Sequence, residues 1–246
     1  MSVSKDVSQV ALLIVAHGER TPEARNENPE RIARSLSGRG LVAEVAVGFV
    51  SGEPSVAAAF GMLRAERIIV YPLFASSGYF TRDRLVHLLD EANGQGRQVD
   101  VLPPLGLDPG LPELVSARAR QIAAERGYAP EASAVILLAH GSRRNSASRE
   151  ATRLIASEIE NLAAFREVQI AFLEERPSLA DAAGMVRGPA VVVGLFSGAG
   201  LHGAKDAPRL IAELGRADVV YAGVIGNAVG IEDLVARAIE DASRAK

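Results

Sequence analysis

Residues 134–141 of this 246-residue chain are AVILLAHG, and residues 11–18 are ALLIVAHG, which places the two stretches 123 positions apart. Each stretch is a short apolar run that ends on a His-Gly pair. An apolar run without polar alternation is typical of a strand buried on both faces of a parallel sheet. The likeness of the two stretches predicts that the chain is an internal duplication.

The same register continues through both halves. Phe49 aligns with Phe172 at the offset of 123, and Leu73-Phe74 aligns with Leu195-Phe196 at 122. Apolar runs predict the strands 10–16, 41–50, 67–74, 98–104, 133–139, 166–173, 189–196 and 218–225. Apolar residues spaced by three and four predict helices between them, among which are 111–126 and 147–162.

Alternation of strands and helices predicts an α/β fold made of two similar, flavodoxin-like halves. Each half is expected to have a mainly parallel sheet flanked by helices, and the two halves are expected to face each other across a cleft. We expect the halves to span residues 1–128 and 129–246, with the linker at 127–131.

Composition excludes several classes of function. The net charge of −3 gives no basic footprint for nucleic acid. The chain has no Cys, which excludes disulfides, thiolate metal sites and a protein-ligated iron–sulfur cluster. The apolar run at 10–16 is too short to span a membrane, and no basic segment of a signal peptide precedes it. We therefore expect a soluble, cytoplasmic protein with no membrane or nucleic-acid partner.

The strand ends predict where the chemistry lies, because ligands of open α/β sheets bind at the carboxyl ends of the strands. In the second half, His140, Glu174 and His202 follow the first, second and third strands. The first half keeps His17 but has Ser51 and Phe80 at the other two positions. The second half is thus expected to hold the intact site and the first a degenerate one.

Two imidazoles and a carboxylate suit a borderline divalent metal such as cobalt, iron or nickel. Imidazole also transfers protons near neutral pH. The sequence therefore predicts His140, Glu174 and His202 as both metal-binding and catalytic residues. Glu175 is the alternative to Glu174, and Asp206, four residues after His202, is placed to orient it or to cap a helix.

The chain resembles the class II chelatases of tetrapyrrole synthesis, in particular the CbiX-like, long two-domain form of sirohydrochlorin cobaltochelatase and ferrochelatase. The segments that carry the resemblance are 137–143 (LLAHGSR), 171–174 (AFLE) with 177–179 (PSL), and 195–206 (LFSGAGLHGAKD). In many two-domain relatives the working site lies in the first half, whereas here the complete set lies in the second.

The resemblance implies ATP-independent insertion of a divalent metal, Co²⁺ or else Fe²⁺ or Ni²⁺, into sirohydrochlorin or a related tetrapyrrole. The metal is then the substrate, no nucleotide is needed, and the chain acts as a monomer or homodimer. His140 and His202 would bind the metal and accept pyrrole protons, assisted by Glu174. The carboxylates of the tetrapyrrole would pair with basic side chains near the predicted cleft, namely Arg143, Arg144, His17, Arg82 and Arg84.

Two alternatives remain open on the residues alone. The degenerate first half also suits a non-catalytic protein that binds a tetrapyrrole or a metal. A more distant alternative is a hydrolase of the histidine-phosphatase type, although Ala16 stands where those enzymes need Arg. The glycines of residues 198–203 match the dinucleotide pattern, but they follow the third strand of their half and not the first, so no nucleotide is expected.

Overall fold

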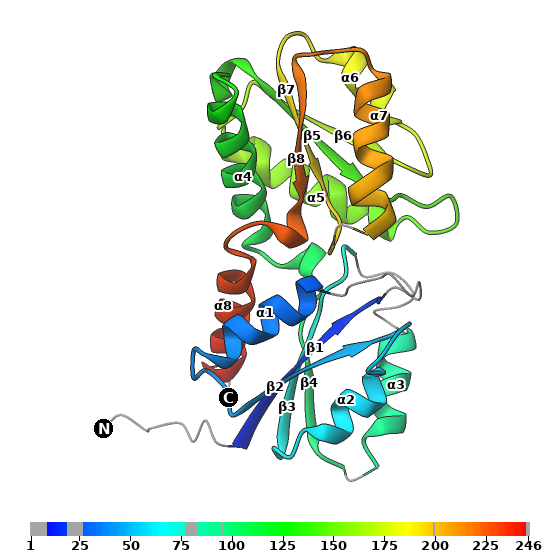
Figure 1. Ribbon diagram of the computed structural model, residues 1–246, viewed down its shortest axis with the longest axis vertical. Helices are drawn as coiled ribbons and strands as arrows, with labels where there is room; N and C mark the ends of the chain where they lie inside the picture. The colour runs from blue at the N-terminus through cyan, green and yellow to red at the C-terminus, as the bar shows by residue number, and fades with distance from the viewer. Residues whose placement is uncertain (1–8, 19–26, 77–82, 95, 199, 245–246) are drawn as a thin grey trace. The chain divides into compact units, whose positions relative to one another are not determined.

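A computed structural model describes residues 9–18, 27–76, 83–94, 96–198 and 200–244 of the chain. Strands and helices alternate along these residues, and the strands form two four-stranded sheets (Figure 1). All the strand pairs within both sheets are parallel. The prediction of an α/β fold with two similar parallel sheets is therefore confirmed.

The first sheet has the strand order β2-β1-β3-β4. Its strands are β1 (Val10–Ala16), β2 (Glu44–Phe49), β3 (Arg67–Pro72) and β4 (Gln98–Val101). The helices that accompany it are α1 (Glu27–Ser37), α2 (Val56–Met62), α3 (Leu85–Ala92) and α8 (Ile231–Arg244).

The second sheet repeats this order as β6-β5-β7-β8. Its strands are β5 (Ala134–Ala139), β6 (Glu167–Phe172), β7 (Ala190–Gly194) and β8 (Val219–Val224). The helices that accompany it are α4 (Leu111–Glu125), α5 (Ala147–Asn161), α6 (Leu179–Met185) and α7 (Ala207–Glu213). The order matches the beginning of the flavodoxin-like order 2-1-3-4-5, as the sequence predicted.

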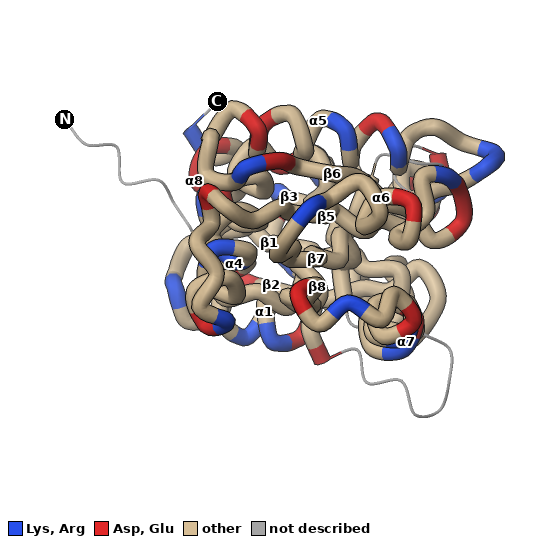
Figure 2. The backbone as a smooth tube through the Cα atoms, turned by 90° about the horizontal axis from the view of Figure 1, so that it is seen from above, with Lys and Arg blue, Asp and Glu red and all other residues tan. Residues whose placement is uncertain are grey.

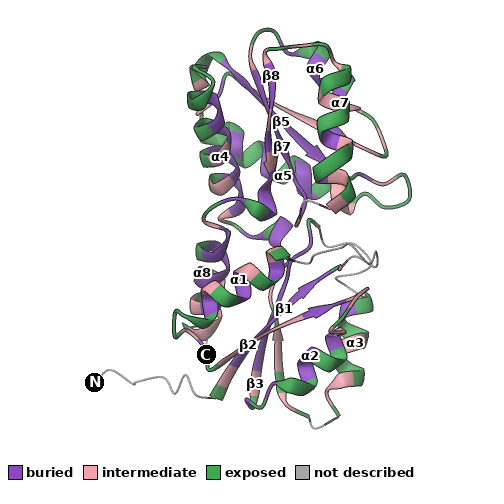
Figure 3. Cartoon of the chain, in the orientation of Figure 1, coloured by how far each residue is buried: buried purple, intermediate pink, exposed green. Residues whose placement is uncertain are grey.

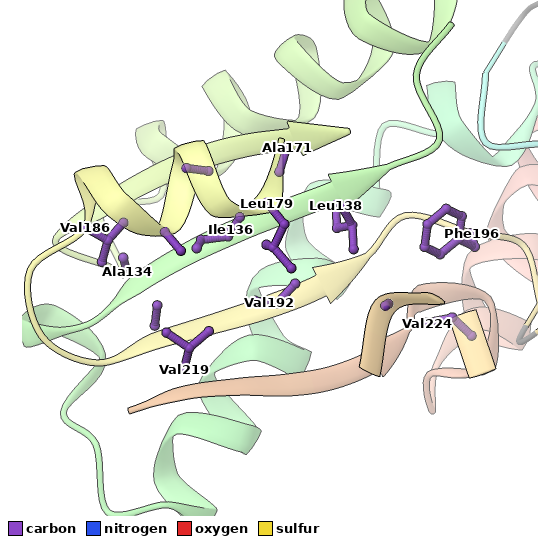
Figure 4. Packing of buried hydrophobic residues seen from close by; sticks show 14 residues of the cluster. Ala134, Ile136, Leu138, Ala171, Leu179, Val186, Val192, Phe196, Val219 and Val224 are labelled. Atoms are coloured by element: carbon purple, nitrogen blue, oxygen red, sulfur yellow. The ribbon is translucent and has the colours of Figure 1, made fainter. Parts of the chain in front are cut away.

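The central strands are buried on both faces, which explains their unbroken apolar sequence. All six residues of β5 are at most 2% exposed. On one face, Ala134, Ile136 and Leu138 pack with Leu179 of α6 and with Val192 of β7 (Figure 4). Helices α4 and α5 contact the strands of this sheet without joining that cluster, so the unit has helices on both faces (Figure 3).

The compact units differ from the predicted halves 1–128 and 129–246 because two helices are exchanged. Helix α4 precedes the predicted boundary but packs on β7, β8 and α5 of the second unit. Helix α8 ends the second half in sequence, yet from Glu232 onward it belongs to the first unit. There, Arg31 forms an ion pair with Glu232, and Arg39 pairs with Asp233 at 2.6 Å.

Two further features of the helices are their length and the distribution of their charge. Among the described helices, none is long and apolar enough to cross a membrane. Figure 2 shows basic and acidic residues mixed along the tube in that view.

The helix exchange predicts a reciprocal effect of two matched substitutions. Val115 of α4 and Val235 of α8 occupy equivalent places in the two repeats, and both are fully buried. Each Val→Ala change should lower the free energy of unfolding by about 1–3 kcal/mol through lost burial and a small cavity. Hydrogen exchange should show Val115→Ala weakening β5–β8 and Val235→Ala weakening β1–β4. The exchange would be contradicted if Val115→Ala lowered the hydrogen-exchange protection of β1–β4 and Val235→Ala lowered that of β5–β8.

Candidate functional site

His140 and His202 lie at the ends of two neighbouring strands. His140 directly follows β5, and the segment that follows β7 carries His202. Strands β5 and β7 are paired in parallel, so their carboxyl ends meet at one edge of the sheet. The connections from these two strands lead to opposite sides of the sheet, to β6 and to β8, and this is the switch point where such folds bind ligands. The two imidazole rings are in edge-to-face contact, with centroids 4.8 Å apart and an interplanar angle of 80°.

A π-helical turn positions His202. The turn spans His202–Asp206 and leads directly into α7. Gly203 allows the turn to approach β8 closely, since a Cβ at this position would lie 2.2 Å from Cγ1 of Val224. The ring of Phe196 lies 6.2 Å from that of His202. π-Helical turns are frequent at functional sites.

Both histidines use the same ring nitrogen, Nδ1, for a hydrogen bond to the protein. Nδ1 of His140 donates to the carbonyl oxygen of Gly141 at 2.9 Å, because a carbonyl can only accept. Nδ1 of His202 donates to the carboxylate Oδ2 of Asp206 at 2.8 Å. A neutral imidazole carries one N–H, so Nε2 of each ring keeps its lone pair. The pair thus offers two acceptors, which suits metal binding or proton uptake.

Gly141 shapes the turn that follows His140. Its φ of +73° lies in the left-handed region, which glycine adopts readily. A Cβ at Gly141 would lie 2.8 Å from Cβ of Phe172 and 2.8 Å from Cγ of Glu175. Gly18, the equivalent residue in the first repeat, has a φ of +78°. The backbone therefore requires glycine directly after the histidine at both strand ends.

Glu174 and Glu175 have different surroundings. The Glu175 side chain is 4% exposed, forms an ion pair with Arg149, and accepts a 3.0 Å hydrogen bond from the backbone N–H of Ser142. Burial alone would raise the pKa of the Glu175 carboxyl, but these hydrogen bonds outweigh burial and hold that pKa below its usual range. Glu174 is exposed. Glu175 is therefore held within the loop by its partners, and Glu174 is the more exposed of the two carboxylates.

A pocket of about 810 Å³ in the second unit is lined by the segments that follow β5 and β6. Arg143, Arg144, Glu174 and Glu175 are among the residues that line it. The Nε of Arg143 donates to the backbone carbonyl of Glu174 at 3.1 Å and so joins the segments that follow β5 and β6. Arg149 and Arg176 also line the pocket, where they pair with Glu175 and Asp181, so Arg143 and Arg144 are the candidates for binding an anionic ligand.

The expected three-residue metal set is not preassembled. Within the part of the chain that the structure describes, no three His, Asp, Glu or Cys side chains lie close enough together to hold a metal ion. The structure brings His140 and His202 together, whereas Glu174 lines the neighbouring pocket.

The remaining predicted residues belong to the first unit. His17 follows β1 and is exposed, and Arg84 is exposed at the start of α3. Arg82 and Phe80 lie outside the described residues. The side chain of His87 on α3 is 61% exposed, and its Nε2 lies 3.3 Å from Oε1 of Glu91.

Two side-chain pairs at the site differ in how far the sequence signals them. The pairing of Arg149 with Glu175 joins the first turn of α5 to the loop after β6, and no local spacing signals it. The contact of Asp206 with His202 had a signal, since side chains four residues apart meet on a helix.

Comparison with known proteins identifies relatives of the whole chain. The model of the CbiX family matches it twice, over residues 11–122 and 134–242, once in each repeat. A curated relative from Halobacterium salinarum, named a probable sirohydrochlorin cobaltochelatase, is 26% identical over 221 residues, which cover 81% of this chain and 75% of the relative.

Solved structures give the same result. A structure described as CbiX, the terminal enzyme for biosynthesis of siroheme in denitrifying bacteria, is 29% identical with a TM-score of 0.75, covering 94% of this chain and 99% of that one. The sirohydrochlorin chelatase SirB from Bacillus subtilis subspecies spizizenii, in complex with cobalt, is 18% identical with a TM-score of 0.77 over 96% of both chains. SirB from Bacillus subtilis with Fe³⁺ is 17% identical with a TM-score of 0.81 over 95% of both, and the two SirB matches show the fold alone.

The lowered pKa of Glu175 predicts a pH-dependent stability. Since the folded-state pKa lies below the ordinary 4.5, the carboxylate stabilises the fold above about that pH, and this contribution is lost as the pH falls through the lower folded-state value. Glu175→Gln should therefore lower the free energy of unfolding at pH 7 by about 1–3 kcal/mol. In urea titrations, the difference in unfolding free energy between Glu175→Gln and the unsubstituted protein should become smaller below pH 4.5.

The neighbouring exposed carboxylate gives the control. Glu174→Gln should change the unfolding free energy by less than about 0.5 kcal/mol at either pH. If the unfolding free-energy difference for Glu175→Gln does not change with pH, the ionised carboxylate is not what stabilises this loop.

Proposed function

The chain belongs to the CbiX family, and from that premise we propose that it inserts a divalent metal ion into sirohydrochlorin or a closely related tetrapyrrole without ATP. The observation that carries this proposal is the pair of imidazoles, His140 and His202, whose rings meet 4.8 Å apart at the switch point of the second sheet. The name of the Halobacterium relative includes the same substrate, and the CbiX structure is described as the terminal enzyme for biosynthesis of siroheme.

The chemistry of the two rings fits the reaction. An incoming metal ion must lose water ligands, and two pyrrole N–H groups must lose protons. Imidazole nitrogen binds borderline divalent metals without the strong hold of a thiolate, so the ion can pass on to the tetrapyrrole. An imidazole that has released the ion can accept a pyrrole proton, because its ring nitrogen then has a free lone pair. His140 and His202 thus serve as transient ligands and as bases.

Glu174 and the arginines complete the proposed site. Glu174 is exposed in the pocket that Arg143 and Arg144 also line, where it can receive a proton or add a metal ligand as the ion passes. The guanidinium groups of Arg143 and Arg144 suit bidentate pairing with the substrate's carboxylates. We propose the same role in carboxylate binding for His17, Arg82 and Arg84 of the first repeat.

The proposed metal is cobalt or iron, with nickel as a further candidate, because imidazole and carboxylate accept all three. The two SirB structures contain cobalt and Fe³⁺ respectively. In this scheme the metal is a substrate and not a resident cofactor, and neither a nucleotide nor an iron–sulfur cluster takes part. A cytoplasmic monomer or homodimer remains the prediction.

A non-catalytic carrier of metal or tetrapyrrole is the second candidate. It is favoured by the observation that only two of the three expected metal-binding side chains lie together among the described residues. A carrier would bind sirohydrochlorin tightly and insert none of the three metals. Measured turnover separates the two candidates.

The first test replaces each histidine in turn. His140→Ala and His202→Ala should each lower the rate of Co²⁺ or Fe²⁺ insertion by roughly 10²–10⁴, the range typical of lost general-base help. The rate is followed as the loss of metal-free sirohydrochlorin absorbance. His87→Ala, which removes an exposed imidazole on α3, should retain the unsubstituted rate. Full activity in both site variants would contradict the proposal.

A second test separates carboxylate binding from chemistry. Arg144→Ala should raise KM for sirohydrochlorin about tenfold and leave kcat nearly unchanged, because a contact made equally in the ground and transition states affects KM alone. Arg209→Ala is the control, since Arg209 pairs with Glu213 on α7. An unchanged KM in the Arg144 variant would remove this arginine from the substrate site.

A further inference from the structure

We infer that Asp206 is the positioning residue of the metal site, which fixes the His202 ring so that Nε2 faces the incoming ion. The inference rests on the proposed function for the use of Nε2, but the orientation itself belongs to the metal-free protein. No metal ligation by Asp206 is involved, since its carboxylate acts through the ring.

The local geometry leaves the ring little freedom. The carboxylate Oδ2 of Asp206 accepts from Nδ1 of His202 at 2.8 Å, one turn further along the π-helical segment. The His202 ring contacts two other rings. Its centroid lies 4.8 Å from that of His140 and 6.2 Å from that of Phe196. Both members of the pair are partly buried, with side chains 39% and 30% exposed, so water competes only in part for the hydrogen bond.

The hydrogen bond also selects the tautomer. A neutral imidazole can carry its proton on either nitrogen, and only the form protonated at Nδ1 leaves Nε2 able to bind a metal. Histidines that bind metals usually donate their other N–H to a carboxylate or a carbonyl, and loss of that partner typically costs 10–100-fold in metal affinity or activity.

The two histidines obtain this partner in different ways. His140 donates to the carbonyl of Gly141, which belongs to the backbone and is retained in every variant. His202 depends on a side chain, and therefore on one replaceable carboxylate. In the first repeat the position of Asp206 is taken by Arg84, whose guanidinium is a donor only and cannot accept from an imidazole.

The alternative is that Asp206 merely stabilises α7 as a surface ion pair. The same helix supplies the control, because Arg209 and Glu213 form a pair at the same spacing of four residues, 2.6 Å apart, in which no site residue takes part. A stabilising role would make Asp206→Ala and Glu213→Ala alike. A positioning role moves the histidine and leaves Glu213→Ala without effect on it.

The experiment compares Asp206→Ala, Asp206→Asn and Glu213→Ala in the full chain. The first readout is ¹⁵N NMR of histidine-labelled, metal-free protein, in which His202→Ala assigns the ring signals and the two nitrogen shifts report the tautomer. The second is the Kd for Co²⁺ alone, and the third is kcat and KM for metal insertion.

We expect the unsubstituted protein to show His202 protonated at Nδ1. Asp206→Ala should mix the tautomers, raise the Co²⁺ Kd roughly 10–100-fold and lower kcat with little change in the tetrapyrrole KM. Asp206→Asn should restore the tautomer and much of the affinity, because the amide oxygen accepts the same N–H. Glu213→Ala should match the unsubstituted protein in all three readouts.

Two results would overturn the inference: a tautomer and Co²⁺ affinity that are unchanged in Asp206→Ala, or an equal loss of affinity in Glu213→Ala. Failure of the proposed function looks different. In that case the unsubstituted protein would insert no metal, while the tautomer and Co²⁺ affinity would still depend on Asp206.

Discussion

The parallel hydrogen bonding of β5 to both β6 and β7 is the constraint on which the site depends. It fixes the carboxyl ends of these three strands at one edge of the sheet, so that residues far apart in sequence come together. His140 follows the central strand, and His202 reaches it from the turn after β7. Because β5 and β7 are buried on both faces by packed apolar side chains, the site stands on a rigid part of the fold.

The two repeats share this framework and use it differently. In the first, Tyr71 of β3 donates through its hydroxyl to the carboxylate of Asp108 at 2.9 Å, and both side chains are buried. Burial and the neighbouring carboxylate raise the pKa of Tyr71, so it stays a neutral donor. Val193 and Ala228 occupy the equivalent positions in the second repeat, which instead carries Glu174 and His202 at its strand ends. One copy has thus gained a buried polar contact while the other keeps the proposed chemistry.

Much of the fold could be predicted because its signals are local. Apolar runs predicted all eight strands of the described chain to within a few residues. The duplication supported each strand by its counterpart in the other repeat. The exchange of α4 and α8 could not be predicted, since the two helices bury an equivalent Val and their sequences do not show which sheet each one covers. The exchange is seen in contacts between distant residues, such as Arg39 with Asp233, and these have no pattern along the chain.

The site shows the same limit. Strand ends located the histidines, but alternation along a strand could not separate Glu174 from Glu175, because β6 ends at Phe172 and both residues lie in the loop beyond it. Their roles follow from Arg149 and the backbone of Ser142, which bind one carboxylate and leave its neighbour exposed.

The central claim is that a metal ion first binds between the two Nε2 atoms of the second repeat. Anomalous diffraction at the cobalt edge, from crystals soaked in Co²⁺ without tetrapyrrole, tests it most directly. The account predicts one dominant peak within coordination distance of Nε2 of both His140 and His202. A dominant peak at His17, or at any position remote from these two rings, would contradict it.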